Sequence, residues 1–285
     1  MGNTQPVELS DRTLPLWCRL ILAGTAISQI FFGLTLLFNP AAVASLWPWT
    51  LSSIAARLLG ASTLVAIPLS LGSAVINRWS AARIPTVMNL TYRVLQIGIG
   101  LTALNRFDFS RPVTWNYFGG GSLMLLFFAL LLWRGPSMGK AVVHDPHALR
   151  ESARLRLGPW GRRVLVAGAV VYFVFGLTLL ALGNQAAQFW FEAPGQLTPL
   201  TARLFASPIT GLALGLWLTT RARYWREVGI PGAGMLTIGV AGSLALLVER
   251  ASIQPPSPVG YAIAATPILL LLAGLYLFAP KPAEP

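Results

Sequence analysis

Eight runs of about 20 mostly apolar residues constrain this chain more than any other feature of its sequence. A helix needs about 20 such residues to cross the hydrocarbon core of a bilayer, and the breaks between the runs carry proline, glycine, asparagine or charge. The sequence therefore predicts an all-α, polytopic transmembrane protein with eight helices. The predicted spans are 16–38, 53–76, 86–104, 115–134, 162–183, 199–219, 230–249 and 259–279.

The composition excludes most other classes of protein. Only 11% of the 285 residues are charged and 55% are hydrophobic, whereas a soluble domain carries roughly 25% charged residues. A disordered chain combines low hydrophobicity with high charge, so that class is excluded too. The single cysteine, Cys18, leaves no basis for a disulfide framework or a cysteine-ligated metal cluster.

An internal repeat organises the chain. The motif Phe32-Gly33-Leu34-Thr35-Leu36-Leu37 returns 143 residues later as Phe175-Gly176-Leu177-Thr178-Leu179-Leu180. Farther along, at an offset of 146 residues, Ala56-Arg57-Leu58 matches Ala202-Arg203-Leu204. These matches predict a tandem duplication. Each copy holds four spans, an even number, so both copies enter the membrane in the same orientation and form a parallel repeat.

The predicted domains are two four-helix membrane repeats joined by a linker. The first repeat covers 1–134 and the second covers 162–285. Within the linker, 135–161, Asp145-Pro146 is a good helix start and Gly158-Pro159 a good stop. The basic residues between them favour either a short basic helix on the membrane surface or a solvated connector.

The basic residues set the predicted orientation. Fifteen of the 21 lysines and arginines fall on the side that holds both termini, five fall on the other side, and Arg93 lies between. Cytoplasmic loops are enriched in lysine and arginine, so we expect both termini in the cytoplasm. The net charge of +12 then reflects this bias rather than a nucleic-acid partner.

Arg57 and Arg203 are candidate ligand-binding residues at equivalent positions of the two copies. Each lies one to two turns inside the outer end of its span, behind a predicted N-cap, Ser52 or Thr198. The helix dipole there disfavours a cation by about 0.3–1 kcal/mol, and partial burial in lipid adds to this cost. We therefore expect an anion beside each arginine. The alternative is that each arginine binds a lipid headgroup by snorkelling, or bonds loop carbonyls and locks the bundle.

A polar face inside the third span is the second candidate site. Asn89, Arg93 and Gln96 lie on one helical face, with Tyr92 beside them. Arg93 is expected about 10 Å from the cytoplasmic end of its span. The matching positions of the second copy are apolar or glycine, so this face belongs to one half only. It predicts either a binding cavity or a cluster of hydrogen bonds between helices.

No catalytic residues and no metal site are predicted. His144 and His147 form a His-x-x-His pair, but Pro146 breaks the geometry and a third strong ligand is missing. The sequence carries no metalloprotease, nucleophile-elbow or phosphate-loop motif. An enzyme is therefore the least supported class, and no cofactor can be named.

Short motifs resemble those of a known group of proteins. The run Leu46-Trp47-Pro48-Trp49, and more closely Leu197-Thr198-Pro199-Leu200-Thr201-Ala202-Arg203, resemble a pattern in uncharacterised bacterial multi-span integral membrane proteins. The resemblance implies a bacterial plasma (inner) membrane location. That group has no assigned activity, so the resemblance implies no functional residues.

These observations predict a non-enzymatic integral membrane protein that binds a lipid or another amphiphilic or anionic molecule. Its contacts would be Arg57, Arg203 and the face of Asn89, Tyr92, Arg93 and Gln96. Two alternatives are an accessory structural subunit of a larger membrane complex and a small-molecule carrier. The expected partners are membrane lipids, and further a larger membrane complex or copies of the same chain.

Overall fold

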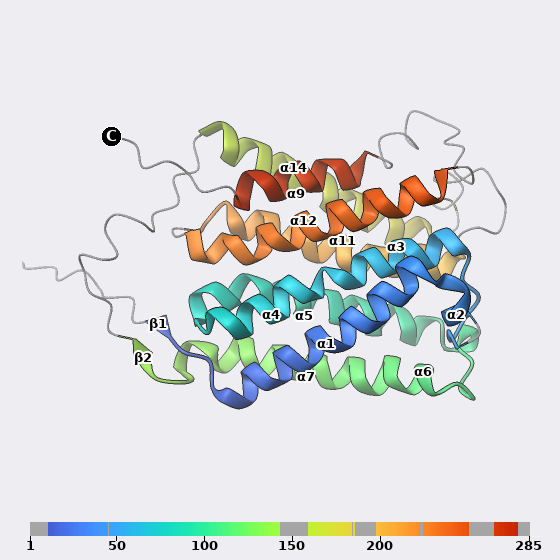
Figure 1. The fold of residues 1–285 in the computed structure, drawn as a ribbon, viewed down its shortest axis with the longest axis horizontal. Helices are drawn as coiled ribbons and strands as arrows, with labels where there is room; N and C mark the ends of the chain where they lie inside the picture. Colours follow the sequence, from blue (N-terminus) through green and yellow to red (C-terminus); the bar gives the residue numbers. More distant parts are fainter. Residues whose placement is uncertain are drawn as a thin grey trace, which may run out of the picture.

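The structure is a computed structural model that describes residues 11–44, 46–142, 159–183, 185, 198–222, 225–250 and 265–278. Long helices lie side by side in one bundle (Figure 1). The first described residues and the end of the last helix lie at the same end of this bundle (Figure 1). We call this the terminal end and the opposite one the far end.

The long helices account for most of the described chain. They are α1 (Leu16–Phe38), α3 (Ser53–Leu64), α4 (Ala66–Ile76), α5 (Trp79–Thr102), α7 (Gly121–Arg134), α9 (Pro159–Leu182), α11 (Pro199–Thr219), α12 (Trp225–Val248) and α14 (Thr266–Phe278). The short elements are β1 (Asp11–Arg12), α2 (Pro40–Ala44), η1 (Leu104–Arg106), α6 (Pro112–Trp115), the π-helix η2 (Asn116–Gly120), η3 (Gly135–Ser137) and β2 (Ala141–Val142). Strands β1 and β2 pair antiparallel, with Asp11 opposite Val142.

The prediction of an all-α chain with several membrane-compatible helices is confirmed. Among the described residues, six helices are long and apolar enough to cross a bilayer: Leu16–Phe38, Ser53–Ile76, Pro112–Ser137, Pro159–Leu182, Pro199–Thr219 and Glu227–Val248. Two of the eight predicted spans are outside this set. Helix α5 is long enough but carries Arg83, Asn89 and Arg93, and α14 has 13 residues. Eight crossings therefore stay a prediction.

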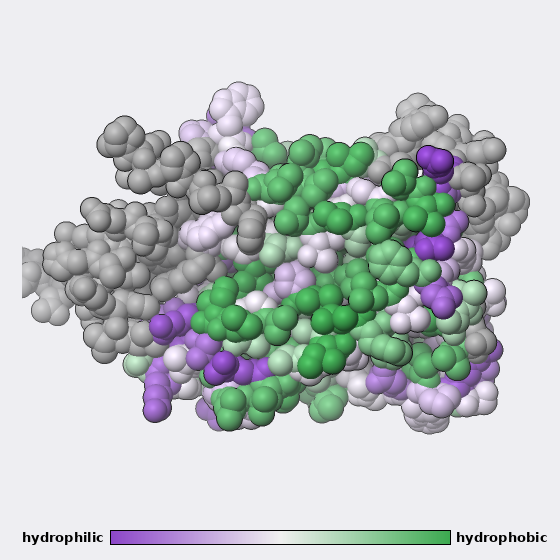
Figure 2. Space-filling model, viewed as in Figure 1, coloured by the Kyte–Doolittle hydropathy of each residue, from purple (hydrophilic) through white to green (hydrophobic). Residues whose placement is uncertain are grey.

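The surface of the bundle is apolar around its middle. Figure 2 shows a hydrophobic zone across the helices, with hydrophilic residues gathered toward the two ends. Large side chains point outward there, such as Ile27 and Phe31, both 67% exposed, and Leu126, 64% exposed. A soluble protein rarely exposes so large an apolar surface, whereas lipid chains solvate it well.

The helices divide into a central group and a peripheral group. Helix α11 is the most enclosed, with 72% of its apolar segment buried, against 22–28% for α1, α7 and α9. Helix α5 packs against α4, α7, α11 and α12, and α12 packs in addition against α3, α4 and α14. The centre therefore combines α3, α4 and α5 with α11 and α12. Because protein rather than lipid surrounds α5, its polar residues are tolerated.

Small residues set the closest helix crossings. A Cβ atom on Gly60 would lie 2.8 Å from both Gly33 O and Leu37 N, so α3 touches the backbone of α1. A Cβ atom on Gly176 of α9 would meet the side-chain hydroxyl of Thr210 on α11. Gly211 and Gly215 of α11 both pack against Met88 of α5. Dispersion contacts of this kind drive helix association in lipid.

Both predicted N-caps are confirmed. The Ser52 hydroxyl accepts a hydrogen bond from the N–H of Ala55 at 3.3 Å, and the Thr198 hydroxyl accepts one from the N–H of Thr201 at 3.2 Å. These bonds satisfy donors that the first turn of a helix leaves open. The predicted linker helix after Asp145 and the His144–His147 pair lie outside the described residues.

Substituting Gly60 with alanine tests the crossing of α1 and α3. Since the new methyl group would meet backbone atoms of α1 at 2.8 Å, the two helices must separate. We expect Gly60→Ala to lower the free energy of unfolding by about 1–3 kcal/mol, measured by thermal unfolding in mild detergent. Gly24→Ala on α1 is the control, because nothing lies within 4 Å of that Cβ position. Equal stability of the two variants would contradict this packing.

Candidate functional site

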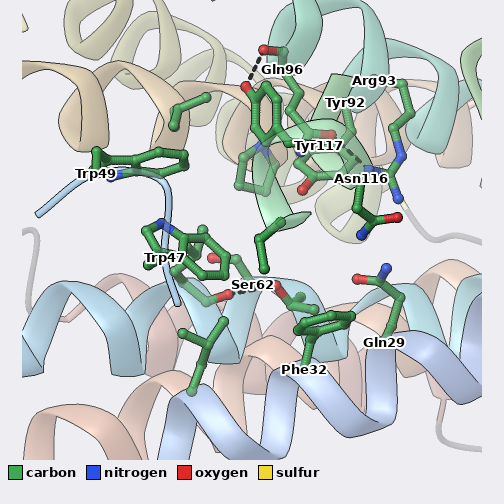
Figure 3. A pocket seen from close by; sticks show the side chains of 16 residues that line it. Gln29, Phe32, Trp47, Trp49, Ser62, Tyr92, Arg93, Gln96, Asn116 and Tyr117 are labelled. Atoms are coloured by element: carbon green, nitrogen blue, oxygen red, sulfur yellow. Dashed lines mark hydrogen bonds between the residues drawn. The ribbon is translucent and has the colours of Figure 1, made fainter. Parts of the chain in front are cut away.

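A partly open cavity of about 100 Å³ lies between α1, α3, α5, η2 and α11 (Figure 3). A smaller cavity of about 30 Å³ lies alongside and shares several wall residues, among them Gln29, Ser62 and Tyr92. The lining of the first cavity is Gln29, Phe32, Leu36, Trp47, Trp49, Leu59, Ser62, Thr63, Tyr92, Arg93, Gln96, Val113, Asn116, Tyr117, Leu204 and Pro208. Asn89 lines the second. The whole predicted polar face of α5 therefore borders these two cavities.

Among the described residues, Arg93 is the only charged side chain in the lining of either cavity. Its side chain is buried, with 8% of the residue exposed. One guanidinium nitrogen, Nη1, donates to Gln96 Oε1 at 2.7 Å, and the guanidinium lies over the Tyr92 ring, 4.9 Å from its centroid. The Nε–H has no hydrogen-bond partner. Neither lining contains an acidic residue, so among the described residues this cation has no carboxylate beside it.

The helix that carries Arg93 begins earlier than the predicted span. Helix α5 begins at Trp79, earlier than the predicted span, because Pro85 lies inside the helix rather than in the break before it. Arg93 therefore lies about 21 Å along the helix from Trp79 and about 14 Å from Thr102, at 1.5 Å per residue. It is closer to the far end of the bundle than to the terminal end.

Asn89 and Gln96 are hydrogen-bonded within α5 and its neighbours. The Asn89 side-chain amide donates to Pro85 O at 3.1 Å. Gln96 accepts from Arg93 through its side chain, and its backbone oxygen accepts from the Tyr117 hydroxyl. These bonds hold the polar face of α5 in place and leave the outer nitrogens of Arg93 toward the cavity.

The π-helix η2 supplies the opposite wall. Its wider turn places Asn116 and Tyr117 in the lining, and Figure 3 shows the Asn116 and Gln29 amides on the side of the cavity toward which Arg93 points. Gly120 permits this turn, because a Cβ there would lie 2.8 Å from Asn116 Oδ1. Single π-helical turns often occur at functional sites. Sequence reasoning missed Gln29 and Asn116; the Gly119-Gly120-Gly121 run was the only local signal.

Two tryptophans close the cavity toward the far end. The Trp49 indole N–H donates to the Thr201 hydroxyl at 3.1 Å, and its ring packs edge-on against Phe107 and Tyr117. The indole nitrogen of Trp47, which also lines the cavity, is a further buried donor with no hydrogen-bond partner.

The two equivalent arginines have different surroundings. Arg57 Nε lies 2.7 Å from Glu249 Oε1, and its Nη1 donates to the carbonyl oxygen of Leu37 near the end of α1. Both contacts favour a cation, since the carboxyl end of a helix carries partial negative charge. Arg203 instead has a buried Nε without a hydrogen-bond partner and lines a separate cavity of about 780 Å³.

No match to known proteins guides the assignment. No protein family matches the chain, and no curated protein or solved structure matches it. Among the described residues, no group of three or more histidine, cysteine, aspartate or glutamate side chains could hold a metal ion. The assignment of function therefore depends on the residues around the cavities.

A double-mutant cycle tests the Arg57–Glu249 ion pair. Side-chain exposures are 16% and 13%, so each single change leaves a largely buried charge unpaired. We expect Arg57→Gln and Glu249→Gln each to lower the unfolding free energy by about 1–3 kcal/mol, and the double variant to lose less than the sum of both. Thermal unfolding in detergent measures all three. Strictly additive losses would mean that the pair contributes nothing.

Proposed function

We propose that this chain is a non-enzymatic integral membrane protein that binds the anionic head of an amphiphile in the Arg93 cavity. The observation that carries the proposal is the state of Arg93, a buried cation with an open Nε–H and no acidic residue in the surrounding lining. Burying an unpaired charge is costly. An anionic ligand offsets that cost where the protein supplies no carboxylate.

The donors around the cavity suit a carboxylate or a phosphate. Arg93 and the open indole N–H of Trp47 are donors without acceptor capacity, and the amides of Gln29 and Asn116 can add further donors. A charge-assisted hydrogen bond from arginine contributes about 1.5–3 kcal/mol. The lining otherwise holds aliphatic and aromatic side chains such as Phe32, Leu36 and Leu59, which favour the first carbons of an acyl chain.

The size of the cavity limits the bound group. Sites for drug-sized ligands occupy about 300–1,000 Å³, and this cavity holds about 100 Å³. It accommodates a headgroup of a few atoms rather than a complete lipid. Asn116 belongs to the lining and is also exposed, so the tail of an amphiphile can lie along the outer surface of the bundle beside η2.

The same proposal includes a parallel internal repeat of four helices. Helix α9 packs against α11 as α1 packs against α3 and α4, and α12 packs against α14 as α5 packs against α7. Contacts across the centre also correspond, because α5 meets α11 and α12 meets α3 and α4. Gly33 faces Gly60 and Gly176 faces Ala206, at offsets of 143 and 146 residues. These equivalent contacts support a duplication with a pseudo-twofold axis along the membrane normal.

We also propose that the terminal end faces the cytoplasm of a bacterial plasma membrane. The ends of α7 and α9 at that side carry Arg134, Arg162 and Arg163, in keeping with the enrichment of cytoplasmic segments in basic residues. Among the described residues, that end also carries Arg12, Arg19, Arg78, Arg83, Lys140 and Arg221, whereas the far end carries only Arg57, Arg106, Arg111, Arg203 and Arg250. Accessibility of single cysteines introduced at Ser137 and Ser110 to a membrane-impermeant thiol reagent in intact cells distinguishes the two orientations.

A matched pair of amphiphiles tests ligand binding at Arg93. We expect purified protein to bind dodecanoate, and to bind dodecanol, which has the same chain and no charge, at least tenfold more weakly. Arg93→Gln should remove the preference for dodecanoate, because Gln lacks the positive charge. Arg162→Gln, at an exposed position, should retain it. The affinities are measured by isothermal titration calorimetry in a neutral detergent.

Two controls make this test decisive. Thermal unfolding of Arg93→Gln shows whether a loss of binding comes from a loss of folding. A folded Arg93→Gln variant that still prefers dodecanoate over dodecanol would refute the proposed site.

A further inference from the structure

The separate cavity that Arg203 lines, at the far end of the bundle, carries an excess of positive charge. Its volume is about 780 Å³, and it lies where α5 ends and α11 begins. Among the described residues, three arginines line it, Arg106, Arg111 and Arg203, and no acidic residue does.

One of the three arginines is already neutralised. Arg111 Nε lies 2.8 Å from Asp108 Oδ2, and Arg111 also donates to the carbonyl oxygen of Trp47. Hydrogen bonds from Ser110 and the neighbouring Arg111 lower the pKa of Asp108 below its ordinary value, so this loop carboxylate stays ionised. Asp108 therefore cancels the charge of Arg111 and leaves that of the other two arginines.

Arg106 and Arg203 have no partner in the described part of the chain. Arg106 is exposed at the rim of the cavity. The Nε of Arg203 is buried without a hydrogen-bond acceptor, and this side chain lies against Gly183 at the end of α9, where a Cβ would come within 2.9 Å of Nε. An anion in the cavity would pair with the guanidinium charge of Arg203, for which the described residues supply no carboxylate.

The other half of the molecule shows what Arg203 lacks. Arg57 occupies the equivalent position against α1 and is paired with Glu249 at the end of α12. The residue 146 positions before Glu249 is Ala103, and Ala103 lines the cavity beside Arg203. Under the internal repeat proposed above, Glu249 supplies a carboxylate to Arg57. The equivalent residue near Arg203, Ala103, has only a methyl group and leaves open space.

We propose that this cavity is a second anion-binding site, in which a phosphate group bound by Arg203 and Arg106 takes the place that Glu249 occupies beside Arg57. Arginine donates in a planar fork that matches two phosphate oxygens, which makes it well suited to phosphate. The cavity lies at an end of the bundle, at the depth where phospholipid headgroups meet the ends of spanning helices. The phosphate comes from such a headgroup or from a free phosphate ester.

Short-chain lipids allow a direct binding test on the full chain in neutral detergent. The probes are dihexanoyl phosphatidic acid, glycerol 3-phosphate and the uncharged dihexanoylglycerol, and calorimetry gives their affinities. We expect phosphatidic acid to bind at least tenfold more tightly than dihexanoylglycerol. Comparable binding of glycerol 3-phosphate identifies a free phosphate ester as the ligand, whereas at least tenfold weaker binding identifies a lipid headgroup. No binding of either phosphate probe overturns the site.

Substitutions locate the binding. Arg203→Gln and Arg106→Gln should each weaken phosphate binding at least tenfold. Arg250→Gln, which removes an exposed charge at the same end outside this lining, should leave it unchanged. All variants of this site, Ala103→Glu and Ala103→Gln included, are measured in the Arg93→Gln background, because an anionic amphiphile also suits the Arg93 cavity; failure of the Arg93 proposal and failure of this one are therefore distinguishable. Unaltered phosphate binding by both Arg203→Gln and Arg106→Gln would overturn the assignment.

Ala103→Glu is the sharpest variant, because it gives Arg203 the carboxylate that Arg57 already has. We expect it to abolish binding of both phosphate probes and to raise the melting temperature of the ligand-free protein. Ala103→Gln, of similar size without the charge, should retain phosphate binding. If Ala103→Glu binds phosphate as well as Ala103→Gln does, the site is wrong; if Ala103→Glu fails to fold, Arg203→Gln and Arg106→Gln decide the question.

Discussion

The apolar surface around the middle of the bundle, which suits hydrocarbon rather than water, governs the rest of the structure. In hydrocarbon every backbone polar group needs an internal partner, which explains a chain built almost wholly from helices. The same constraint applies to charges, and three arginines show three responses to it. Arg57 is paired with Glu249, Arg93 has Gln96 and the Tyr92 ring but one open donor, and Arg203 has an open, shielded Nε.

Helix packing decides where cavities can form. At the crossings of α1 with α3 and of α11 with α5, glycines bring the helices into close contact. Gly239, 146 residues after Arg93, makes the same kind of close contact between α12 and α14, because a Cβ on it would meet Leu271 N at 2.5 Å. In the first half, the matching position holds Arg93 instead of glycine, and the facing helix contains the π-helical turn η2. The two halves therefore differ most at the place where the cavity lies.

Under the duplication that we propose, this asymmetry explains how a bundle of two halves can acquire specialised sites. Residues that hold the helices together correspond in the two halves, such as the N-caps Ser52 and Thr198 and the arginines Arg57 and Arg203. Residues around the cavities do not correspond, because Arg93 matches a glycine and Ala103 matches Glu249. Duplication thus preserves the packing, while unmatched positions can change charge without disturbing it.

Local features of the fold could be predicted from the sequence. Apolar runs, N-caps and the polar face of α5 depend on residues within one or two helical turns, and hydrophobicity and hydrogen bonding act at that range. The predicted start of α5 was too late, because proline was expected only in the breaks between helices. Pro85 instead lies inside α5, where the neighbouring helices tolerate it.

Contacts between residues far apart in the chain could be found only from the packing of the helices. Glu249 lies 192 residues from Arg57, and nothing local indicates that it pairs with Arg57 rather than with Arg203. Gln29 and Asn116 join the Arg93 cavity from α1 and η2, through a π-turn that the glycine run only hinted at. Apolar helices whose sequences include arginines could be predicted from the sequence alone. The packing of those helices determined which arginine is neutralised and which ones border a cavity, because charge pairing depends on distance in space.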